Sequence, residues 1–403
     1  MDILQSMKFE EFDLAPEIIE AISYMGFETA SPIQEKAIPA AIKGKDVLAV
    51  AQTGTGKTAA FTLPVLHNIL QNKITGTSTL IITPTREIAL QIDRQIQGFS
   101  YFLGINSLAV YGGGDADEWE QQKKALRDGV EVIVATPGKL LSHLGMNYAK
   151  TDKIQHLILD EADRMLDMGF LDDIKRIISK IPKKRQTLMF SATMPPKIEG
   201  LAKQILNEPE FISIAISKPA ESVFQGVYLT YENQKTPLIN HLISDQEEYK
   251  SILVFTSTKK KVNDIVRGLR NKNYRVEAIS SDFEQSKREE IMTDFRANKI
   301  RVLVATDVIS RGVDIPQIDL VFNYDAPGNA EEYVHRIGRT GRAGAEGVAL
   351  TLINELDMEK FDAIEKLIEK KVYRAQMPDF MGKGPEWKVR VRRNSKGKKP
   401  FRK

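Results

Sequence analysis

The stretch DVLAVAQTGTGKT, residues 46–58, joins a short apolar run to a glycine-rich turn and decides the fold. Residues 46–51 are typical of a buried strand, and those after Lys57 are typical of a helix. Glycines let backbone N–H groups surround phosphate oxygens, and the helix dipole favours their negative charge. Ala51 stands where the pattern GxxxxGK[ST] has its first glycine, so the strand–turn–helix context supports the interpretation. We expect a nucleotide site with Lys57 at the β- and γ-phosphates and Thr58 on Mg²⁺.

A second strand candidate ends in acidic residues. The segment LILDEAD, residues 157–163, places Asp160 at a strand tip and Glu161 beside it. Asp160 there can hold Mg²⁺ through water, and Glu161 can orient and deprotonate an attacking water. A lone Asp-Glu pair usually begins a helix, but together with the phosphate loop this pair predicts a hydrolytic site.

Apolar runs alternate with helical patterns in two series, which predicts two parallel sheets, each buried on both faces. The strand candidates are 46–51, 79–83, 130–136, 156–160 and 187–191, then 251–257, 275–280, 301–306, 320–325 and 347–353, with a helix near 355–371. The pattern breaks near 216–224. We therefore expect the fold class α/β, with domains at 1–216 and 223–371, a linker at 217–222 and a flexible, disordered basic tail at 372–403.

Composition limits the protein class. The 403 residues are 42% hydrophobic and 28% charged, which suits a soluble protein of two domains. The sequence has neither a long uncharged apolar run nor the pattern of a secretory signal, so we expect no membrane contact. Cysteine is absent, which excludes disulfides and thiolate metal sites and fits a cytoplasmic location.

The net charge of +3 is unevenly distributed. Residues 383–403 hold ten Lys or Arg and one Glu, so they carry +9 and the remainder carries −6. Basic residues mixed with Trp387 and Phe401 fit an arm that adds nonspecific affinity for a nucleic acid. A nuclear address or a merely solubilising tail would have the same composition.

These motifs together resemble one family, the DEAD-box RNA helicases. DEAD at 160–163, AQTGTGKT at 51–58, SAT at 191–193 and HRIGRTGR at 335–342 are among about nine motifs in the family's order. The resemblance spans residues 9–370. It implies two tandem RecA-like domains, ATP and Mg²⁺, and a monomer that binds single-stranded RNA and short RNA duplexes. The short tail and compact core are similar to those of small bacterial helicases such as the RhlE-like group.

By resemblance, ATP contacts come from both domains. Gln34 would read the adenine edge through its amide, and Phe9 would stack on the base. The implied ATP-binding residues are Phe9, Phe27, Gln34, Gln52, Thr53, Gly54, Thr55, Gly56, Lys57, Thr58, Gly312, Asp314, Arg339 and Arg342. The implied catalytic residues are Lys57, Asp160, Glu161, His335, Arg339 and Arg342, with Thr58 and Asp160 at the metal.

The resemblance makes Arg339 and Arg342 arginine fingers that the second domain carries to the γ-phosphate held by the first. The alternative is that these two arginines belong to a cluster of ion pairs with a purely structural role. The residues implied to couple the domains are Asp163, Ser191, Thr193, His335 and Arg336. The implied RNA contacts are Pro84, Thr85, Arg86, Gly112, Gly113, Thr136, Pro137, Gly138, Arg288 and Thr306. They offer backbone amides, hydroxyls and helix N-termini, which hold the RNA backbone and do not read bases.

The sequence departs from the family pattern in four places. Lys139 replaces an Arg, Ile88 replaces a Leu, Ala30 stands where Pro is frequent, and SSD at 280–282 replaces His-Gly-Asp. The last change puts RNA contacts of the second domain in doubt.

We therefore expect an ATP-dependent RNA helicase, with RNA-stimulated ATP hydrolysis coupled to local unwinding of short duplexes. Two alternatives remain at this point. One is an ATP-gated RNA clamp that serves as an assembly platform, which needs the same motifs. The other is a phosphate-loop ATPase that acts on proteins or small molecules, which RNA would not stimulate.

Overall fold

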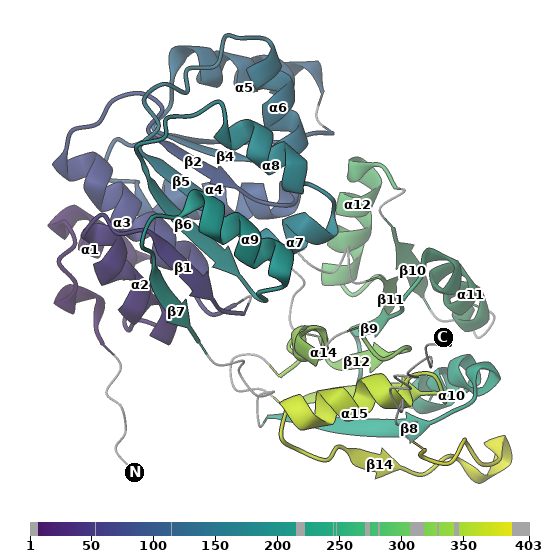
Figure 1. Ribbon diagram of the computed structural model, residues 1–403. Coiled ribbons are helices and arrows are strands. Elements are labelled where there is room, and N and C mark those ends of the chain that lie inside the picture. Colours follow the sequence, from purple (N-terminus) through teal and green to yellow (C-terminus); the bar gives the residue numbers. More distant parts are fainter. Residues whose placement is uncertain are drawn as a thin grey trace, which may run out of the picture. The chain divides into compact units, whose positions relative to one another are not determined.

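The computed structural model describes residues 7–388 except 53, 114, 215–221, 245, 247, 271–274, 281–282, 307–317, 329 and 342–345. The chain divides into two compact units, Met1–Ile216 and Ser217–Lys403 (Figure 1). Each unit contains a parallel β-sheet with helices on it, so the predicted α/β class with two RecA-like domains is confirmed. No helix in the described ranges is long and apolar enough to cross a membrane.

The sheet of the first unit has the strand order β3-β4-β2-β5-β6-β1-β7. Its strands are β1 (Val47–Val50), β2 (Thr79–Ile82), β3 (Ser107–Val110), β4 (Val132–Ala135), β5 (His156–Leu159), β6 (Gln186–Ser191) and β7 (Glu210–Ser213). All five predicted strands are present. The two strands that were not predicted, β3 and β7, lie at the two edges of the sheet, where the first two residues of β3 are half-buried and three of the four residues of β7 are exposed.

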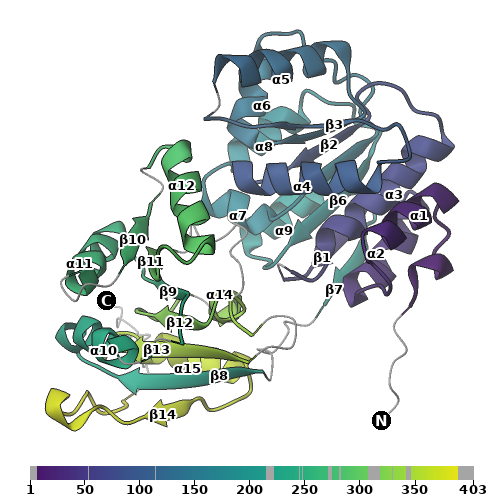
Figure 2. The same cartoon turned by 180° about the vertical axis from the view of Figure 1, so that it is seen from behind.

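Helices cover both faces of this sheet (Figures 1 and 2). One apolar layer packs α1 (Pro16–Tyr24), α2 (Pro32–Ile42), α3 (Lys57–Gln71) and α4 (Arg86–Phe99) against the sheet, together with the short 3-10 helix Phe9–Glu11. The other layer packs α5 (Ala116–Asp128), α6 (Pro137–Gly145), α7 (Ala162–Asp167), α8 (Leu171–Ile178) and α9 (Pro196–Ile205). Successive strand residues alternate between the layers, with Ile81 in the first and Leu80 in the second.

The sheet of the second unit has the order β10-β11-β9-β12-β13-β8-β14. Its strands are β8 (Val223–Leu229), β9 (Ile252–Phe255), β10 (Val276–Ile279), β11 (Val302–Ala305), β12 (Leu320–Asn323), β13 (Gly347–Ile353) and β14 (Tyr373–Ala375). Its helices are α10 (Glu232–Ser244), α11 (Lys259–Arg270), α12 (Gln285–Arg296), α14 (Ala330–Ile337) and α15 (Met358–Leu367), with the 3-10 helix Asp379–Met381. The predicted strands and the predicted last helix are present, whereas β8 and β14 were not predicted.

The predicted tail begins too early. Residues 373–375 form β14, which pairs with β8, and Gly384 approaches the Leu229 carbonyl so closely that a Cβ would not fit. Trp387 packs 4.4 Å from the Arg374 guanidinium and 6.5 Å from the Phe361 ring. Residues 372–388 therefore belong to the second unit, because their apolar and aromatic side chains cover it. Residues 389–403 of the predicted tail lie outside the described part.

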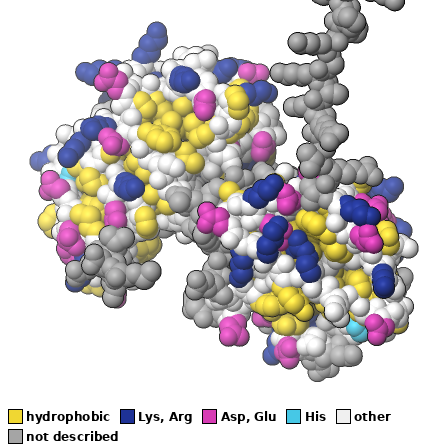
Figure 3. Space-filling view, turned by 60° about the horizontal axis from the view of Figure 1, so that its bottom comes forward, with side chains coloured by type: hydrophobic (Ala, Val, Ile, Leu, Met, Phe, Trp, Pro, Cys, Tyr) yellow, Lys and Arg dark blue, Asp and Glu magenta, His cyan; other side chains and the backbone are white. Residues whose placement is uncertain are grey.

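Charged side chains of both signs are interspersed over the face drawn in Figure 3. A different arrangement exists inside the second unit, where Asp325 and Lys235 are buried together. The Asp325 carboxylate accepts hydrogen bonds from Thr256 Oγ1 at 2.8 Å, Ser257 N at 2.9 Å and Lys261 Nζ at 2.6 Å. Burial alone would raise the pKa of Asp325, but Lys261, Lys235 and the Ser257 amide outweigh it and hold that pKa below its usual range.

We predict that Asp325→Asn destabilises the protein by about 3–5 kcal/mol near pH 7, because it leaves buried Lys235 undercompensated. A depressed folded-state pKa gives stability that is present above the unfolded pKa of 3.8 and is lost as pH falls. The difference from wild type in urea unfolding should therefore be constant above about pH 5 and shrink at lower pH. Asp294→Asn, at an exposed ion pair with Lys299, is the matched control and should cost less than about 1 kcal/mol. Equal effects of the two substitutions would contradict this account.

Candidate active site

The phosphate loop runs from the end of β1 to the start of α3. Gly54 and Gly56 have φ angles of 85° and 90°, a left-handed conformation that favours glycine. Thr55 Oγ1 donates to the Gln52 carbonyl at 2.7 Å, and Lys57 Nζ donates to the Ala51 carbonyl at 3.1 Å. Ala51 has no positive φ, so an alanine is accommodated where the loop pattern has its first glycine. Thr58 is half-buried in the first turn of α3, and Thr53 lies outside the described residues.

The predicted acidic pair follows β5. Asp160 and Glu161 are both buried, and Glu161 has a φ of 51°, an uncommon left-handed conformation for a non-glycine residue. Burial raises the pKa of Asp160 to about 6 against the opposing charge of Lys57. The pKa of Glu161 is lowered, since Arg164 and Lys57 outweigh its burial. Glu161 is therefore ionised at neutral pH in a site that already contains a buried cation.

Sequence reasoning missed Arg164. Its Nη1 lies 2.8 Å from Glu161 Oε2, and its side chain is buried beside the carboxylate. Residues three apart on a helix are neighbours, so the position of Arg164 after Glu161 was the available signal. This ion pair fixes the rotamer of the predicted catalytic base.

Asp163 connects the acidic segment to the SAT segment, which begins at the last residue of β6. Its Oδ2 accepts from Thr193 N at 2.9 Å and from Thr193 Oγ1 at 2.8 Å. Its own backbone N–H donates to Ser191 Oγ at 3.2 Å, and Ser191 Oγ donates to the Thr193 carbonyl at 2.8 Å. Three of the residues predicted to couple the domains are thus joined in one network within the first unit.

Gln34 lies against the phosphate loop. Its Nε2 donates to the Gly56 carbonyl at 3.0 Å, and its Oε1 accepts from Ser31 N at 2.8 Å at the start of α2. A Cβ on Gly56 would collide with the Gln34 amide. The amide predicted to read adenine is therefore in direct contact with the loop predicted to hold phosphate.

Phe9, predicted to stack on the base, is buried in the first unit. Only 1% of Phe9 is exposed, and its ring meets Phe27 edge to face, with centroids 6.2 Å apart at 83°. Phe27 is half-buried and also contacts Phe99. Phe9 thus packs against Phe27, and Phe27 presents a partly open aromatic surface. The stacking role of Phe9 stays a prediction.

The RNA segments predicted in the first domain gather at neighbouring strand ends. Val110 of β3 pairs with Ala135 of β4, and Ala135 pairs with Ile82 of β2, so the loops after these strands leave the sheet together. Thr85 caps α4 by accepting from Ile88 N, and Thr136 precedes α6. Arg86 Nη1 donates to the Gly113 carbonyl at 3.2 Å. The structure thus brings together Pro84, Thr85, Arg86, Gly112, Gly113, Thr136, Pro137 and Gly138.

The two sets of predicted residues occupy different parts of one sheet edge. The phosphate loop, the acidic pair and SAT follow β1, β5 and β6, which are adjacent in the sheet. The RNA segments follow β3, β4 and β2. Since β2 pairs with β5, the two regions meet between these strands.

The second unit holds its predicted residues at several places. His335 on α14 and Arg339 after it are half-buried, as are Arg288 on α12 and Thr306. Thr306 follows β11 and lines a cavity of about 100 Å³ with Lys259, Ser280 and Phe283. Gly312, Asp314 and Arg342 lie outside the described residues.

Arg336, predicted to couple the domains, is buried in the second unit. It is 2% exposed, and its Nη1 donates to the Asp325 carbonyl at 2.8 Å and contacts Asn323 Oδ1 at 3.3 Å. Its guanidinium also lies 5.3 Å from the Phe255 ring centroid. The side chain is directed into the second unit, where carbonyl and π contacts compensate for its burial.

Fold and site together define a phosphate-loop nucleotide hydrolase built from two RecA-like units. Residues 31–201 match the DEAD/DEAH box helicase family, and residues 234–344 match the helicase conserved C-terminal domain. The chain belongs to the DEAD-box helicase family.

Named relatives agree with this assignment. The chain is 42% identical to the ATP-dependent RNA helicase CshA of Listeria monocytogenes, over 93% of this chain and 71% of that one. It is 41% identical to the DEAD-box ATP-dependent RNA helicase RhpA of Helicobacter pylori, over 94% and 76% of the two chains. A structure of S. cerevisiae Dbp5 bound to RNA and ADP BeF3 gives a TM-score of 0.80 at 30% identity, over 92% and 96%. The resemblance to the RhlE-like group stays a prediction.

We predict that Phe27→Ala weakens binding of a fluorescent ATP analogue by about tenfold, because stacking surface for the base is lost. Phe9→Ala should instead lower the free energy of unfolding by about 3–5 kcal/mol, as expected for a buried aromatic. Binding titrations and urea unfolding separate the two effects. If the Phe9→Ala protein were as stable as wild type but did not bind ATP, that result would support stacking of Phe9 on the base.

Proposed function

We propose that this protein is an ATP-dependent RNA helicase that hydrolyses ATP in response to RNA and separates short duplexes with little sequence preference. The proposal rests on one observation: two different sets of loops lie side by side at one edge of the first sheet. A phosphate loop and a buried acidic pair follow β1 and β5, while helix N-termini and backbone amides suited to phosphates follow the neighbouring β3, β4 and β2.

The residues present fit ATP and Mg²⁺. Gln52 Nε2 is buried without a hydrogen-bond partner among the described residues, so the loop retains an unused donor. Burial of Asp160 beside Glu161 raises its pKa, and a divalent cation would favour its charged form. Asp160 and the Thr58 hydroxyl would hold Mg²⁺, and Lys57 would hold the phosphates. When bound, the metal would neutralise charge that develops on the transferring phosphoryl group.

Each protein group then has a definite task. Glu161 orients the attacking water and accepts its proton, and Arg164 holds the carboxylate in place. The Gln34 amide, already in contact with Gly56, reads the adenine edge, and Phe27 stacks on the base. Asp163 transmits changes at the acidic pair to Ser191 and Thr193 through the hydrogen bonds that join them.

The second domain supplies the remaining groups in this proposal. Arg339 and Arg342 act as arginine fingers on the γ-phosphate, and His335 assists the coupling between domains. Closure on ATP and RNA bends one strand of a duplex so that its partner is released, and hydrolysis reopens the protein. The RNA-clamp alternative uses the same closure but would keep RNA bound. The helicase names of the relatives favour unwinding. We further propose that the protein acts as a monomer in the cytoplasm.

The ATPase rate measured with and without single-stranded RNA tests the function. We predict strong stimulation, because hydrolysis requires RNA in the closed state. Equal rates would contradict the proposal and favour a phosphate-loop ATPase with another target.

We predict that Glu161→Gln retains ATP binding but lowers turnover by about 10²–10⁴-fold, since an amide cannot accept the proton. Equilibrium binding of an ATP analogue and phosphate release at saturating RNA measure the two quantities. Asp173→Asn, in the exposed pair with Arg176, is the control for loss of an acidic group and should retain turnover. Fast turnover by Glu161→Gln would mean that another group is the base.

A further inference from the structure

Two cations lie in the first turns of helices at the proposed RNA edge. Arg86 is the first residue of α4, and Lys139 is the third residue of α6. The positive end of a helix dipole disfavours a cation at these positions. Other groups must therefore compensate for the unfavourable field and hold each side chain in place.

Trp119 of α5 holds Lys139. The Lys139 ammonium lies 4.1 Å from the indole ring centroid, and tryptophan is the strongest aromatic partner of a cation. Lys139 replaces the Arg of the family pattern, so a flexible ammonium group stands in place of a planar guanidinium group. Contact with the indole restricts that flexibility, so less conformational entropy is lost when the ammonium meets a phosphate.

His143 keeps the indole in position. It lies one turn after Lys139 on α6, and its ring stacks on Trp119 with centroids 4.1 Å apart and planes inclined by 19°. Its Nδ1 is hydrogen-bonded to the Tyr148 hydroxyl, and its Nε2 lies 3.3 Å from Gln122 Oε1. Burial, with a smaller effect of the Lys139 charge, lowers the pKa of His143 to about 4. The stacked ring is therefore neutral at physiological pH and does not repel Lys139.

Glu118, next to Trp119 on α5, contacts the other cation, Arg86. Glu118 Oε1 lies 3.7 Å from Arg86 Nη2 and accepts a 3.3 Å hydrogen bond from the Tyr111 hydroxyl. The Arg86 guanidinium lies 4.5 Å from the Tyr111 ring centroid. Two consecutive residues of one helix thus hold the cations that begin α4 and α6.

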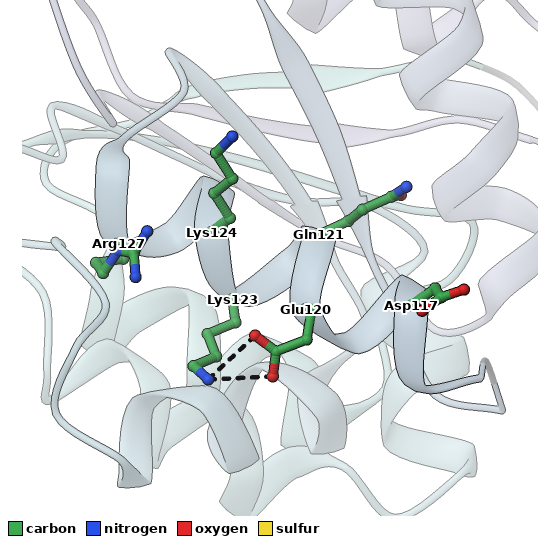
Figure 4. A pocket seen from close by; sticks show the side chains of 6 residues that line it. All are labelled: Asp117, Glu120, Gln121, Lys123, Lys124 and Arg127. Carbon is green, nitrogen blue, oxygen red and sulfur yellow. Dashed lines mark hydrogen bonds and ion pairs between the residues drawn. The ribbon is translucent and has the colours of Figure 1, made fainter.

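Another face of α5 provides a contrast. Figure 4 shows six of its side chains, with Lys123 bonded to Glu120 on the same helix. These side chains, Asp117, Glu120, Gln121, Lys123, Lys124 and Arg127, line an open, polar depression on the surface. Lys123 is a cation on the same helix with no aromatic partner among the described contacts of α5, which makes it a matched control for Lys139.

We propose that Trp119 is a positioning residue for RNA binding, which holds the Lys139 ammonium ready to contact a backbone phosphate. The inference rests on the proposed function, because it takes the edge formed by β2, β3 and β4 as the RNA surface. It assigns to α5 the task of holding the cations that α4 and α6 present.

The test measures the affinity of the full chain for a fluorescent oligouridylate with a non-hydrolysable ATP analogue bound. Trp119→Ala should raise the Kd about three- to tenfold, and Trp119→Phe should recover most of the affinity. The RNA concentration for half-maximal ATPase stimulation should rise in parallel, with little change in the rate at saturating RNA. Lys123→Ala, on the outer face, should bind RNA as wild type does.

A double-mutant cycle separates positioning from packing. Trp119→Ala should add no further loss of RNA affinity in a Lys139→Ala background. Additive losses, or equal effects of the Phe and Ala substitutions, would overturn the inference. If Trp119→Ala does not fold, Trp119→Leu, which keeps apolar volume but removes the aromatic face, completes the cycle with Lys139→Ala. If RNA does not stimulate the ATPase of the wild-type protein, the proposed helicase function is refuted. If RNA stimulates the wild-type protein but the cycle shows additive losses, only the role of Trp119 is refuted.

Discussion

The parallel, in-register pairing of the strands in the first unit is the constraint on which the site depends. Val110, Ala135, Ile82 and Leu159 are matched across four neighbouring strands, and Val50 is matched with Ser191 across two others. Carboxyl ends of parallel strands meet at one edge, so loops far apart in the chain are brought together. Without this alignment, the phosphate loop, the acidic pair and the RNA segments would share no surface.

Buried charge follows from that arrangement. The edge places Lys57, Asp160, Glu161 and Arg164 in a small interior volume, where each carboxylate depends on a nearby cation. Asp163 extends this cluster to Ser191 and Thr193 through direct hydrogen bonds. A change of ligand at the acidic pair can therefore move the SAT segment, because Asp163 is bonded to both of its ends, through its carboxylate to Thr193 and through its backbone N–H to Ser191. In the proposed mechanism, this network is the route by which the bound nucleotide would affect the rest of the protein.

Much of this could be predicted from sequence, since apolar runs and glycine-rich turns are local signals. The ten predicted strands are present, and the phosphate loop joins a strand to a helix as expected. The features that were not predicted have several causes. The edge strands β7 and β14 carry charged and exposed residues, and Gln225 and Gly226 interrupt the interior strand β8. The burial of Phe9 and Arg336 depends on neighbours distant in sequence. Pairings such as Arg164 with Glu161 and Trp119 with Lys139 depend on side-chain packing, which a motif does not specify.

The central claim is that ATP and RNA bind to adjacent regions of one sheet edge and influence each other. Its most direct test is the RNA affinity of the wild-type protein with and without a saturating non-hydrolysable ATP analogue. The account predicts that the analogue tightens RNA binding and that RNA tightens analogue binding by the same factor, as thermodynamic linkage requires. RNA affinity that is unchanged by the analogue would contradict it.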